Sequence, residues 1–481
     1  MSERADFDVP ADVAYFNTAN LAPQLHAVRA AGEAALERRA RPWTISAADW
    51  FSDAERLRTL FGTLVGADAE GVALVPATSY GFAVAARNLA LGAGDRVVVL
   101  AEEYPSGIYA WRAAARRTGA EIVTVARGAG QTWTDALLAV LDERVTVVSV
   151  PNVHWTDGAL VDLDAVAART RDVGARLVID GSQSIGVMPL DVGELRPDFV
   201  VSVGYKWLLG PFSVGYLYVA EEHRQGEPLE ENWILRAGSE DFARLVDYRD
   251  EYQPGARRFD AGARTKFELT PMAIAALEQL LEWEIPHVAA TLAAVTADIA
   301  RRACELELDP LPDDQRGPHM LGVHLPDGVR KRMLPALAEA GCYAAVRGSS
   351  LRIAPHLHTT SGDVERLLAA LAGAVHGEPA RERRRADRRD RPGADPSLPR
   401  AAATVIRDCL NVRPGERVLV VCDSSTSELA HALRDAAEAA GGEAAVMLTG
   451  QHRAHDHGTE PPAPVAAALA ATEVFIAATT A

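Results

Sequence analysis

The sequence predicts an α/β protein with a large domain built on a mainly parallel sheet, a smaller α+β domain and a C-terminal α/β module. Three observations support this fold class. Short Val- and Ile-rich runs alternate with longer amphipathic segments from Asp68 onward. Strand-like runs among helices continue from about residue 270 to 375, and a charged segment then precedes a new helix–strand–helix–strand pattern. Apolar runs separated by helices are typical of βαβ units whose strands are buried on both faces.

The predicted strands follow one another in a regular order. In the large domain they lie in "GVALVP", "DRVVVLAEEYP", "AEIVTVA", "VTVVSVPNV", "ARLVIDGSQSIG" and "DFVVSVGYKWLLG". Segments such as "YGFAVAARNLAL" and "SGIYAWRAAARRTG" between them have the periodicity of helices. In the smaller domain we expect strands in "HMLGVHLP", "CYAAVRG" and "SLRIAPH". The predicted boundaries are an N-terminal segment 1–60, a large domain 61–260, a small domain 261–375, a charged linker 376–398 and a C-terminal module 399–481.

Length and charge limit the class of protein. The 481 residues are enough for two or three domains, and 48% hydrophobic content is ordinary for a globular chain. A net charge of −17 argues against a nucleic-acid or anionic-membrane binder and favours a small-molecule substrate. The arginine-rich run "ARERRRADRRDR" could form a basic patch, but its interspersed acids and lack of aromatics favour a solvated linker.

Cysteine usage and the N-terminus predict a cytoplasmic protein. The four cysteines are scattered and form neither a disulfide framework nor a CxxC metal site, which suits a reducing compartment. The start "MSERADFDVPADVAYF" lacks the basic and apolar regions of a signal peptide. No apolar run reaches the length needed to span a membrane, so we expect no membrane contact.

A lysine at the end of a predicted buried strand is the first candidate for chemistry. In "VVSVGYKWLLGP" the apolar run Val200–Val203 leads directly to Lys206, and lysine is rarely buried without a reason. Asp180 stands 26 residues earlier, also at the end of a strand, where ligands bind in open α/β sheets. One further α/β unit separates the two residues, so we expect their strand ends to lie close together. Asp180 alone would fit a helix cap equally well.

Two further features complete a set. Thr78 and Ser79 follow a strand and precede a helix, where backbone N–H groups can bind an anion, although an ordinary N-cap has the same pattern. Tyr104 follows the next strand and offers a flat ring, although such an aromatic is most often packing. A lysine amine, an acid, an anion site and a flat ring are what an enzyme needs to hold an aldehyde cofactor as a Schiff base.

The order of motifs resembles a known family. The order TS, EEYP, PNVHWTDG, DGSQSIG, GYKWLLGP, RFDAG and SLRIAPH is similar to the aminotransferase class V branch of fold-type I enzymes dependent on pyridoxal phosphate (PLP). Within it, the chain most resembles isopenicillin N epimerase-like and cysteine desulfurase-like proteins over about residues 10–375. The resemblance implies that Lys206 carries PLP as a Schiff base and that Asp180 pairs with the pyridinium nitrogen. It also implies the other cofactor contacts: Asn152 and Gln183 with the phenolic oxygen, Tyr104 with the ring, and Thr78, Ser79 and Tyr205 with the phosphate.

The same resemblance implies an amino-acid substrate and a homodimer. Arg352 matches the arginine that grips the substrate α-carboxylate in a bidentate manner, Arg347 assists it, and Asn20 lies where the N-terminal segment closes over the substrate. In this family the partner chain adds a phosphate contact from an RF-x-x-G-T segment. Here that segment is "RFDAGART", with Ala263 where threonine is usual. Either Thr265 or Arg264 substitutes for it, or the contact is missing.

The sequence leaves the reaction subtype open. Cysteine desulfurases carry a nucleophilic cysteine on a loop before the carboxylate arginine, whereas Cys342 lies in an apolar strand pattern and is interpreted as packing. Desulfuration is therefore disfavoured. We expect Cα-proton abstraction with Lys206 as the base, followed by epimerisation, transamination or elimination including C–S lysis. His154 is either a second acid or base or a histidine without a catalytic task. A non-catalytic relative is the remaining alternative, disfavoured because Lys206, Asp180 and Arg352 are all present.

The C-terminal module has a second resemblance. Residues 399–481, with "PGERVLVV" and "EPPAPVAAAL", are similar to the N-terminal region of leucyl aminopeptidase T-like (M29) metallopeptidases, whose metal ligands lie further along. His452, His455 and His457 could suggest a metal cluster, but "HRAHDH" in a polar loop without cysteines favours solvated residues. We therefore expect no metal and no peptidase activity, and a docking, oligomerisation or substrate-presenting role.

Overall fold

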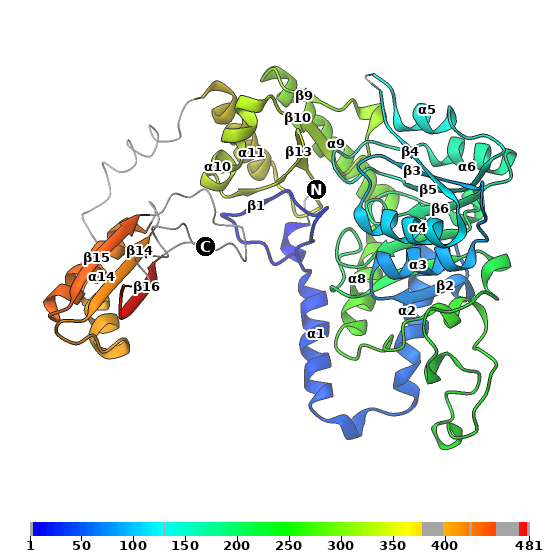
Figure 1. Ribbon diagram of the computed structural model, residues 1–481, viewed down its shortest axis with the longest axis horizontal. Helices are drawn as coiled ribbons and strands as arrows, with labels where there is room; N and C mark the ends of the chain where they lie inside the picture. The colour runs from blue at the N-terminus through cyan, green and yellow to red at the C-terminus, as the bar shows by residue number, and fades with distance from the viewer. Residues whose placement is uncertain (1–2, 129, 378–397, 423–425, 449–470, 479–481) are drawn as a thin grey trace. The chain divides into compact units, whose positions relative to one another are not determined.

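The computed structural model describes residues 3–128, 130–377, 398–422, 426–448 and 471–478 (Figure 1). The chain forms two compact units, Met1–Ala380 and Arg381–Ala481. The first contains the predicted large and small domains, and the second contains the C-terminal module. Within the described ranges, no helix is long and apolar enough to cross a membrane.

A seven-stranded sheet forms the centre of the large domain. Its order is β2-β8-β7-β6-β5-β3-β4. Strand β8 pairs antiparallel with both β2 and β7, while the other neighbours are parallel. The expected mainly parallel α/β sheet is therefore confirmed. The strands are β2 (Val72–Val75), β3 (Arg96–Leu100), β4 (Glu121–Val125), β5 (Val145–Pro151), β6 (Arg176–Asp180), β7 (Phe199–Val203) and β8 (Gly215–Val219).

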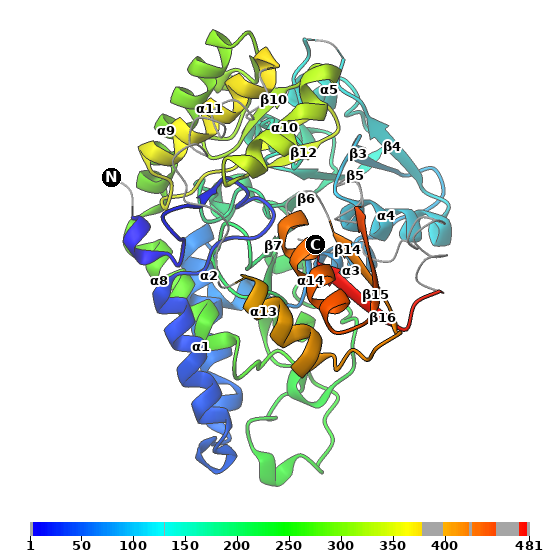
Figure 2. The same cartoon turned by 90° about the vertical axis from the view of Figure 1, so that its left-hand side faces the viewer.

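Helices cover both faces of this sheet, which explains why its central strands are continuous apolar runs. One face packs on α2, α6 and α8, and the other packs on α3 and α4. Figures 1 and 2 show α1, α2 and α8 side by side at one edge of the domain. The helices are α1 (His26–Arg39), α2 (Ser52–Val65), α3 (Thr78–Asn88), α4 (Pro105–Thr118), α5 (Trp133–Leu138), α6 (Leu163–Asp172), α7 (Val192–Leu195) and α8 (Thr270–Trp283).

The small domain is an antiparallel sheet covered by helices. The sheet has the order β12-β13-β10-β9 and packs on α9, α10 and α11 around its own apolar core. Its elements are α9 (Ile285–Glu305), β9 (Asp309–Pro310), β10 (Leu321–His324), α10 (Asp327–Glu339), β11 (Cys342–Tyr343), β12 (Ala345–Arg347), β13 (Ser350–Ile353) and α11 (Ser361–His376).

The N-terminal segment connects the two domains. Strand β1 (Ala14–Tyr15) pairs parallel with β11, and Asn17 forms a bridge with Ala354. A few residues later the backbone N–H of Ala22 donates to the carbonyl of Tyr205 at 3.0 Å. The first twenty-odd residues therefore touch both the small domain and the loop that follows β7.

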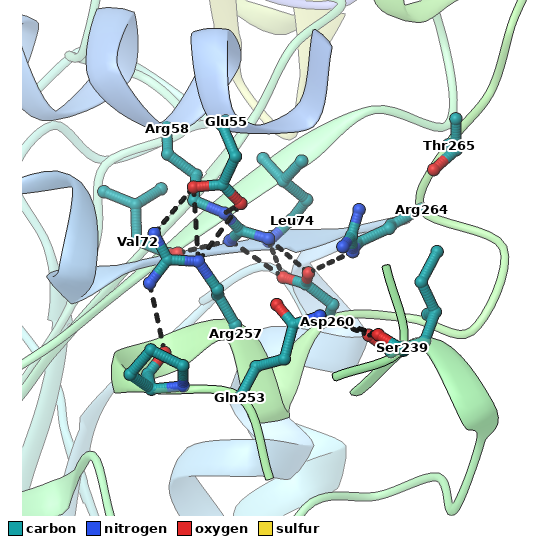
Figure 3. A network of polar contacts seen from close by, with 12 residues as sticks. Glu55, Arg58, Val72, Leu74, Ser239, Gln253, Arg257, Asp260, Arg264 and Thr265 are labelled. Carbon is teal, nitrogen blue, oxygen red and sulfur yellow. Dashed lines mark hydrogen bonds and ion pairs between the residues drawn. The ribbon is translucent and has the colours of Figure 1, made fainter. Parts of the chain in front are cut away.

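A buried network of charges fixes the segment before α8 against α2 (Figure 3). Asp260 is fully buried and pairs with Arg58, which is also fully buried, while one carboxylate oxygen accepts from the Leu74 N–H at 2.8 Å. Arg264 adds a second cation to Asp260 at 2.7 Å. Glu55 lies between Arg58 and Arg257, at 3.0 and 2.6 Å. Because a buried charge needs partners, this network fixes the position of residues 257–264.

The C-terminal unit has a three-stranded parallel sheet of order β15-β14-β16. Helix α14 packs on one face of that sheet around a small apolar core. The elements are α13 (Leu398–Thr404), β14 (Arg417–Cys422), α14 (Ser427–Ala439), β15 (Glu443–Leu448) and β16 (Val474–Ala478). His452, His455 and His457 and most of the predicted linker 376–398 lie outside the described residues.

Candidate active site

A pocket lies where three neighbouring strands end. Pro151 at the end of β5 is opposite Asp180 at the end of β6, and Asp180 is opposite Val201 in β7. The carboxyl ends of parallel strands are the usual ligand site of an open α/β sheet. The pocket is lined by Thr78, Glu103, Tyr104, Pro151, Val153, Trp155, Asp180, Ser182, Gln183, Val203, Tyr205 and Lys206. A more open hollow in residues 231–250 shares none of these residues.

Lys206 is held in this pocket by the tight turn after β7. The N–H of Gly204 donates to the Val214 carbonyl at 2.7 Å, and a Cβ on Gly204 would lie 2.8 Å from that oxygen, so only glycine fits. Lys206 is 9% exposed, and its amine nitrogen lies 5.4 Å from the centroid of the Tyr104 ring. Burial lowers the pKa of this amine to about 8, against the attraction of Asp180. About one tenth of the amine is therefore neutral at pH 7.

Two carboxyl groups share the pocket with Lys206, and the sequence indicated only one of them. Asp180 accepts from the Ser182 N–H at 2.9 Å, and burial raises its pKa. Glu103 accepts from the Tyr104 N–H at 2.6 Å; burial, and then the charge of Asp180, raise its pKa to about 8. The motif EEYP contains the only signal for Glu103, an acid directly after a strand and before the aromatic. Asp180 and Lys206 are brought together as expected.

The predicted anion site has the expected backbone. Helix α3 begins at Thr78, after Ala77 in extended conformation, so its first N–H groups are at the pocket edge. A Cβ on Gly81 would lie 2.7 Å from the Val201 side chain, so this glycine lets the start of α3 pack tightly on β7. Thr78 is buried and lines the pocket, whereas Ser79 is exposed. Tyr205 lines the opposite side with a half-buried ring.

Asn152 and Gln183 lie at the expected strand ends, but both bind protein atoms. The Asn152 amide donates to the Val161 carbonyl at 3.2 Å. Gln183 lines the pocket, donates to the Ala19 carbonyl at 3.1 Å and accepts from the Trp207 indole at 2.8 Å. Each side-chain amide therefore makes one donation within the chain and keeps a second N–H donor.

His154 is enclosed by protein. Its ring nitrogens contact the Thr156 hydroxyl at 2.7 Å and the Ala101 carbonyl at 3.2 Å, and the ring stacks on Trp133. The residue is fully buried, and burial lowers the pKa of its ring. His154 is absent from the pocket wall, so its surroundings favour the interpretation without a catalytic task.

Arg352 lies on β13 and reaches the large domain. It is 2% exposed, and its guanidinium donates to the Trp155 carbonyl at 2.6 Å and to the Asn17 side chain at 3.3 Å. Burial, and then the neighbouring charge of Arg347, lower its pKa to about 10. Asn17 is the contact from the N-terminal segment, whereas Asn20 has an exposed side chain. Trp155 lies in the motif PNVHWTDG, where the sequence indicates no role for the tryptophan; it lines the pocket, and its carbonyl binds Arg352.

The two predicted substitutes for Ala263 are turned toward their own chain. Arg264 pairs with Asp260 and lies 5.2 Å from the centroid of the Phe51 ring. The Thr265 hydroxyl donates to the Trp50 carbonyl at 2.5 Å. Ala263 itself is exposed. Because both side chains bind their own chain, this arrangement favours the third alternative, in which no side chain of this segment contacts the phosphate in the partner chain.

Cys342 packs in the core of the small domain. It lies on β11, is 3% exposed and belongs to the cluster that includes Ala14 of β1. Burial raises the pKa of its thiol to about 11, so the thiolate needed for nucleophilic attack is disfavoured.

Comparison with known proteins shows the family. The aminotransferase class-V family model matches residues 44–351, and the chain therefore belongs to that family. An uncharacterised aminotransferase of Bacillus subtilis, YcbU, is 27% identical over 66% of this chain and 83% of its own length. A kynureninase of Deinococcus radiodurans is 30% identical over 56% of this chain and 66% of its own. Among solved structures, a mutant of C-DES with glycine covalently linked to its PLP cofactor has a TM-score of 0.70 at 20% identity. That match covers 77% of this chain and 99% of the solved one.

The protein is accordingly a PLP-dependent enzyme of fold type I, as the motif order predicted. The pocket fits that cofactor on its own evidence. It combines an amine of lowered pKa, a buried acid, an aromatic ring and the start of a helix. Among the described residues, Glu103 Oε2 is a buried pocket atom without a hydrogen-bond partner. Unpaired buried polar atoms are costly, and a polar ligand would satisfy them.

Proposed function

We propose that this protein binds PLP through Lys206 and uses the same lysine to remove the Cα proton of an α-amino acid. The observation that carries the proposal is the Lys206 amine, buried in the pocket beside Asp180 and held near neutral pKa. The neutral form of an amine with a pKa of about 8 is accessible at physiological pH, and that form can act both as a nucleophile and as a proton acceptor.

Other residues would hold the cofactor in a fixed orientation. Asp180 would supply the anion that keeps the pyridine nitrogen protonated, and the Tyr104 ring would stack on the cofactor. The phosphate would bind at the start of α3, by Thr78, Ser79 and Tyr205. Asn152 and Gln183 each donate one amide N–H within the chain, and the second N–H of each amide would donate to the phenolic oxygen.

Lys206 and Arg352 would act on the substrate. Bound PLP withdraws electrons from the Cα of an attached amino acid, which makes its proton acidic. Lys206 accepts that proton, and Arg352 binds the α-carboxylate with its remaining N–H donors, with Arg347 beside it. Asn20 would face the substrate from the N-terminal segment, whose residue Asn17 contacts Arg352. Because Arg352 holds the α-carboxylate, it sets the orientation of the substrate and thereby which bond to Cα is broken.

The reaction after proton removal has several possible courses. Transamination, β-elimination including C–S lysis, and epimerisation of the isopenicillin N epimerase type all begin in this way. Epimerisation needs a second proton donor on the opposite side, and the enclosed position of His154 speaks against that residue. Cysteine desulfurase chemistry is disfavoured because Cys342 is buried with a raised thiol pKa.

Assembly and location are further parts of the proposal. We expect a homodimer, as the family resemblance implies, in the cytoplasm, as the few scattered cysteines indicate. The C-terminal unit, with its resemblance to M29 peptidases, would serve docking, oligomerisation or substrate presentation without peptidase activity. Sedimentation of the full chain, and assays of aminoacyl reporters with added divalent metal, test these two points.

The test of the central proposal is spectroscopic. The purified protein with PLP should be yellow, and borohydride should remove the visible band and leave a pyridoxyl adduct on the Lys206 peptide in mass spectrometry. Lys206→Ala should lack both the band and the adduct. A wild-type protein that stays colourless with PLP, or an adduct on another lysine, would contradict the assignment.

A further inference from the structure

Two arginines of the small-domain sheet lie on the same face. In the register of β12 and β13, Arg352 is opposite Ala345 and Arg347 is opposite Ser350. Ser350 and Arg352 are two residues apart on one strand and so share a face, which their cross-strand partners also share. Arg347 and Arg352, here called the arginine pair, are therefore diagonal neighbours on one surface of the sheet.

This face is packed toward the pocket. Gly322 of β10 is opposite Arg352, and a Cβ there would lie 2.4 Å from the Asp157 carbonyl oxygen, so the sheet lies directly on the loop around Trp155. Arg352 binds the Trp155 carbonyl, and the guanidinium carbon of Arg347 lies 5.9 Å from the centroid of the Trp155 ring. Trp155 lines the pocket and meets Tyr104 edge to face at 5.7 Å. The arginine pair therefore borders the pocket through one shared tryptophan.

The pair has no anionic partner among the residues that the structure describes. The protein acceptors of Arg352 are the Trp155 carbonyl and the Asn17 amide oxygen, and Arg347 donates only to the carbonyl of its neighbour Val346. Asp157, the acid of the adjoining loop, is already paired with Arg127 at 2.7 Å. Other arginines in this domain do have carboxylate partners, as Arg316 has with Asp313.

The number of donors exceeds what one carboxylate can use. A guanidinium carries five N–H donors, and the protein occupies two of those of Arg352 and one of those of Arg347. A bidentate α-carboxylate fills one fork. A carboxylate bound to Arg352 therefore leaves the charge of the neighbouring Arg347 unpaired, with two parallel N–H donors still free to bind a second anion.

We propose that the substrate is an α-amino acid whose side chain ends in a second anionic group, and that Arg347 binds that group while Arg352 binds the α-carboxylate. This substrate class rests on the function proposed above. Trp155 would form the wall between the two anions. Arg347 is thereby the residue that selects acidic over neutral side chains, since only the acidic side chain pairs with the second fork.

The test compares anions with and without a second charge. Titration calorimetry with the PLP-loaded wild-type protein would measure succinate against butanoate, glutarate against pentanoate, and adipate against hexanoate. At least one dicarboxylate should bind ten-fold or more tightly than its matched monocarboxylate. Arg347→Gln should weaken dicarboxylate binding more than monocarboxylate binding and so remove that advantage. Arg347→Lys should restore part of it, and Arg352→Gln should weaken both members of the pair.

A control variant removes an arginine charge that lies beside the same hairpin. Arg330 on α10 donates to the Gly348 carbonyl at 3.4 Å but is paired with Asp327, so Arg330→Gln should keep the full dicarboxylate advantage. No advantage at any length in the wild type would overturn the inference, as would an advantage that survives in Arg347→Gln. If Arg347→Gln weakened the dicarboxylate and the monocarboxylate equally, both arginines would bind the same carboxylate, and the inference would also be wrong. The visible band of bound PLP, recorded first in each variant, reports the proposed function separately.

Discussion

The buried charge network around Asp260 gives a prediction whose size follows from the structure. Asp260 and Arg58 are both 0% exposed, and Asp260 also faces Arg264. Asp260→Asn keeps the shape and the contact with the Leu74 N–H but removes the negative charge from between two buried guanidiniums (Figure 3). Removing one partner of a buried ion pair costs about 3–5 kcal/mol. Glu55 still contacts Arg58, so we expect a value near the lower end.

The expected change in melting temperature follows from the size of the unit. Unfolding entropy is about 2.1 cal/mol/K per residue, so the unit Met1–Ala380 has about 0.8 kcal/mol/K. A loss of 3–5 kcal/mol then lowers Tm by about 4–6 °C in calorimetry of the cofactor-free protein. The matched control is Glu278→Gln on α8. It removes the exposed ion-pair partner of Arg56, which lies on α2 like Arg58. An exposed pair contributes under about 1 kcal/mol, or about 1 °C. If Asp260→Asn melts no lower than the control, the network does not stabilise this segment as we infer.

Three further predictions concern the site and its surroundings. Arg352→Lys should raise the KM for the amino-acid substrate about ten-fold or more and leave the PLP band intact, because lysine cannot reproduce a bidentate contact; loss of the band would mean that Arg352 is misassigned. Glu103→Gln should stabilise the cofactor-free protein at pH 8. The pKa of Glu103 is about 8 in the folded protein against 4.5 in the unfolded chain. The wild type therefore loses roughly 3 kcal/mol or more of unfolding free energy as pH rises from about 4.5 to 8. Urea midpoints of the two proteins that coincide at pH 8 would refute this. Burial lowers the pKa of His319 to about 3 and that of His358 to about 4, below the unfolded value of 6.5. Both rings are buried in the neutral form, so the free energy of unfolding is highest above pH 6.5 and should fall by roughly 1.4 kcal/mol per histidine per pH unit between pH 6.5 and 4. Denaturation curves that are unchanged from pH 6.5 to 5 would count against this prediction.

Much of the fold could be predicted because its signals are local. Continuous apolar runs between amphipathic segments predicted the parallel sheet, and strand ends predicted that Asp180 and Lys206 would meet. The antiparallel insertion of β8 between β2 and β7 could not be foreseen, since pairing partners depend on the hairpin that follows Lys206. Local pattern does not record which strand lies beside which.

The site was predictable where a residue follows a strand and less so where loops meet. Glu103 and Trp155 line the pocket because two loops from separate strands converge, and neither residue has a distinctive spacing. Asn17, which the sequence did not indicate, contacts Arg352 because the bridge to Ala354 fixes the register of the N-terminal segment. That register depends on pairing across the whole chain, which a single sequence does not reveal.

The N-terminal segment also has a consequence for synthesis. Asn17 and Arg352 are 335 residues apart, and β1 pairs with a strand that is made almost as late. At about 5–20 residues per second, a ribosome needs roughly 17–67 s to travel that distance. During this time the large-domain sheet can form and residues 19–22 can contact it, but β1 and Asn17 still lack their partners in the small domain. Strand β1 must wait for β11 of the small domain, so the contact between Asn17 and Arg352 forms only when translation of the unit Met1–Ala380 is nearly over.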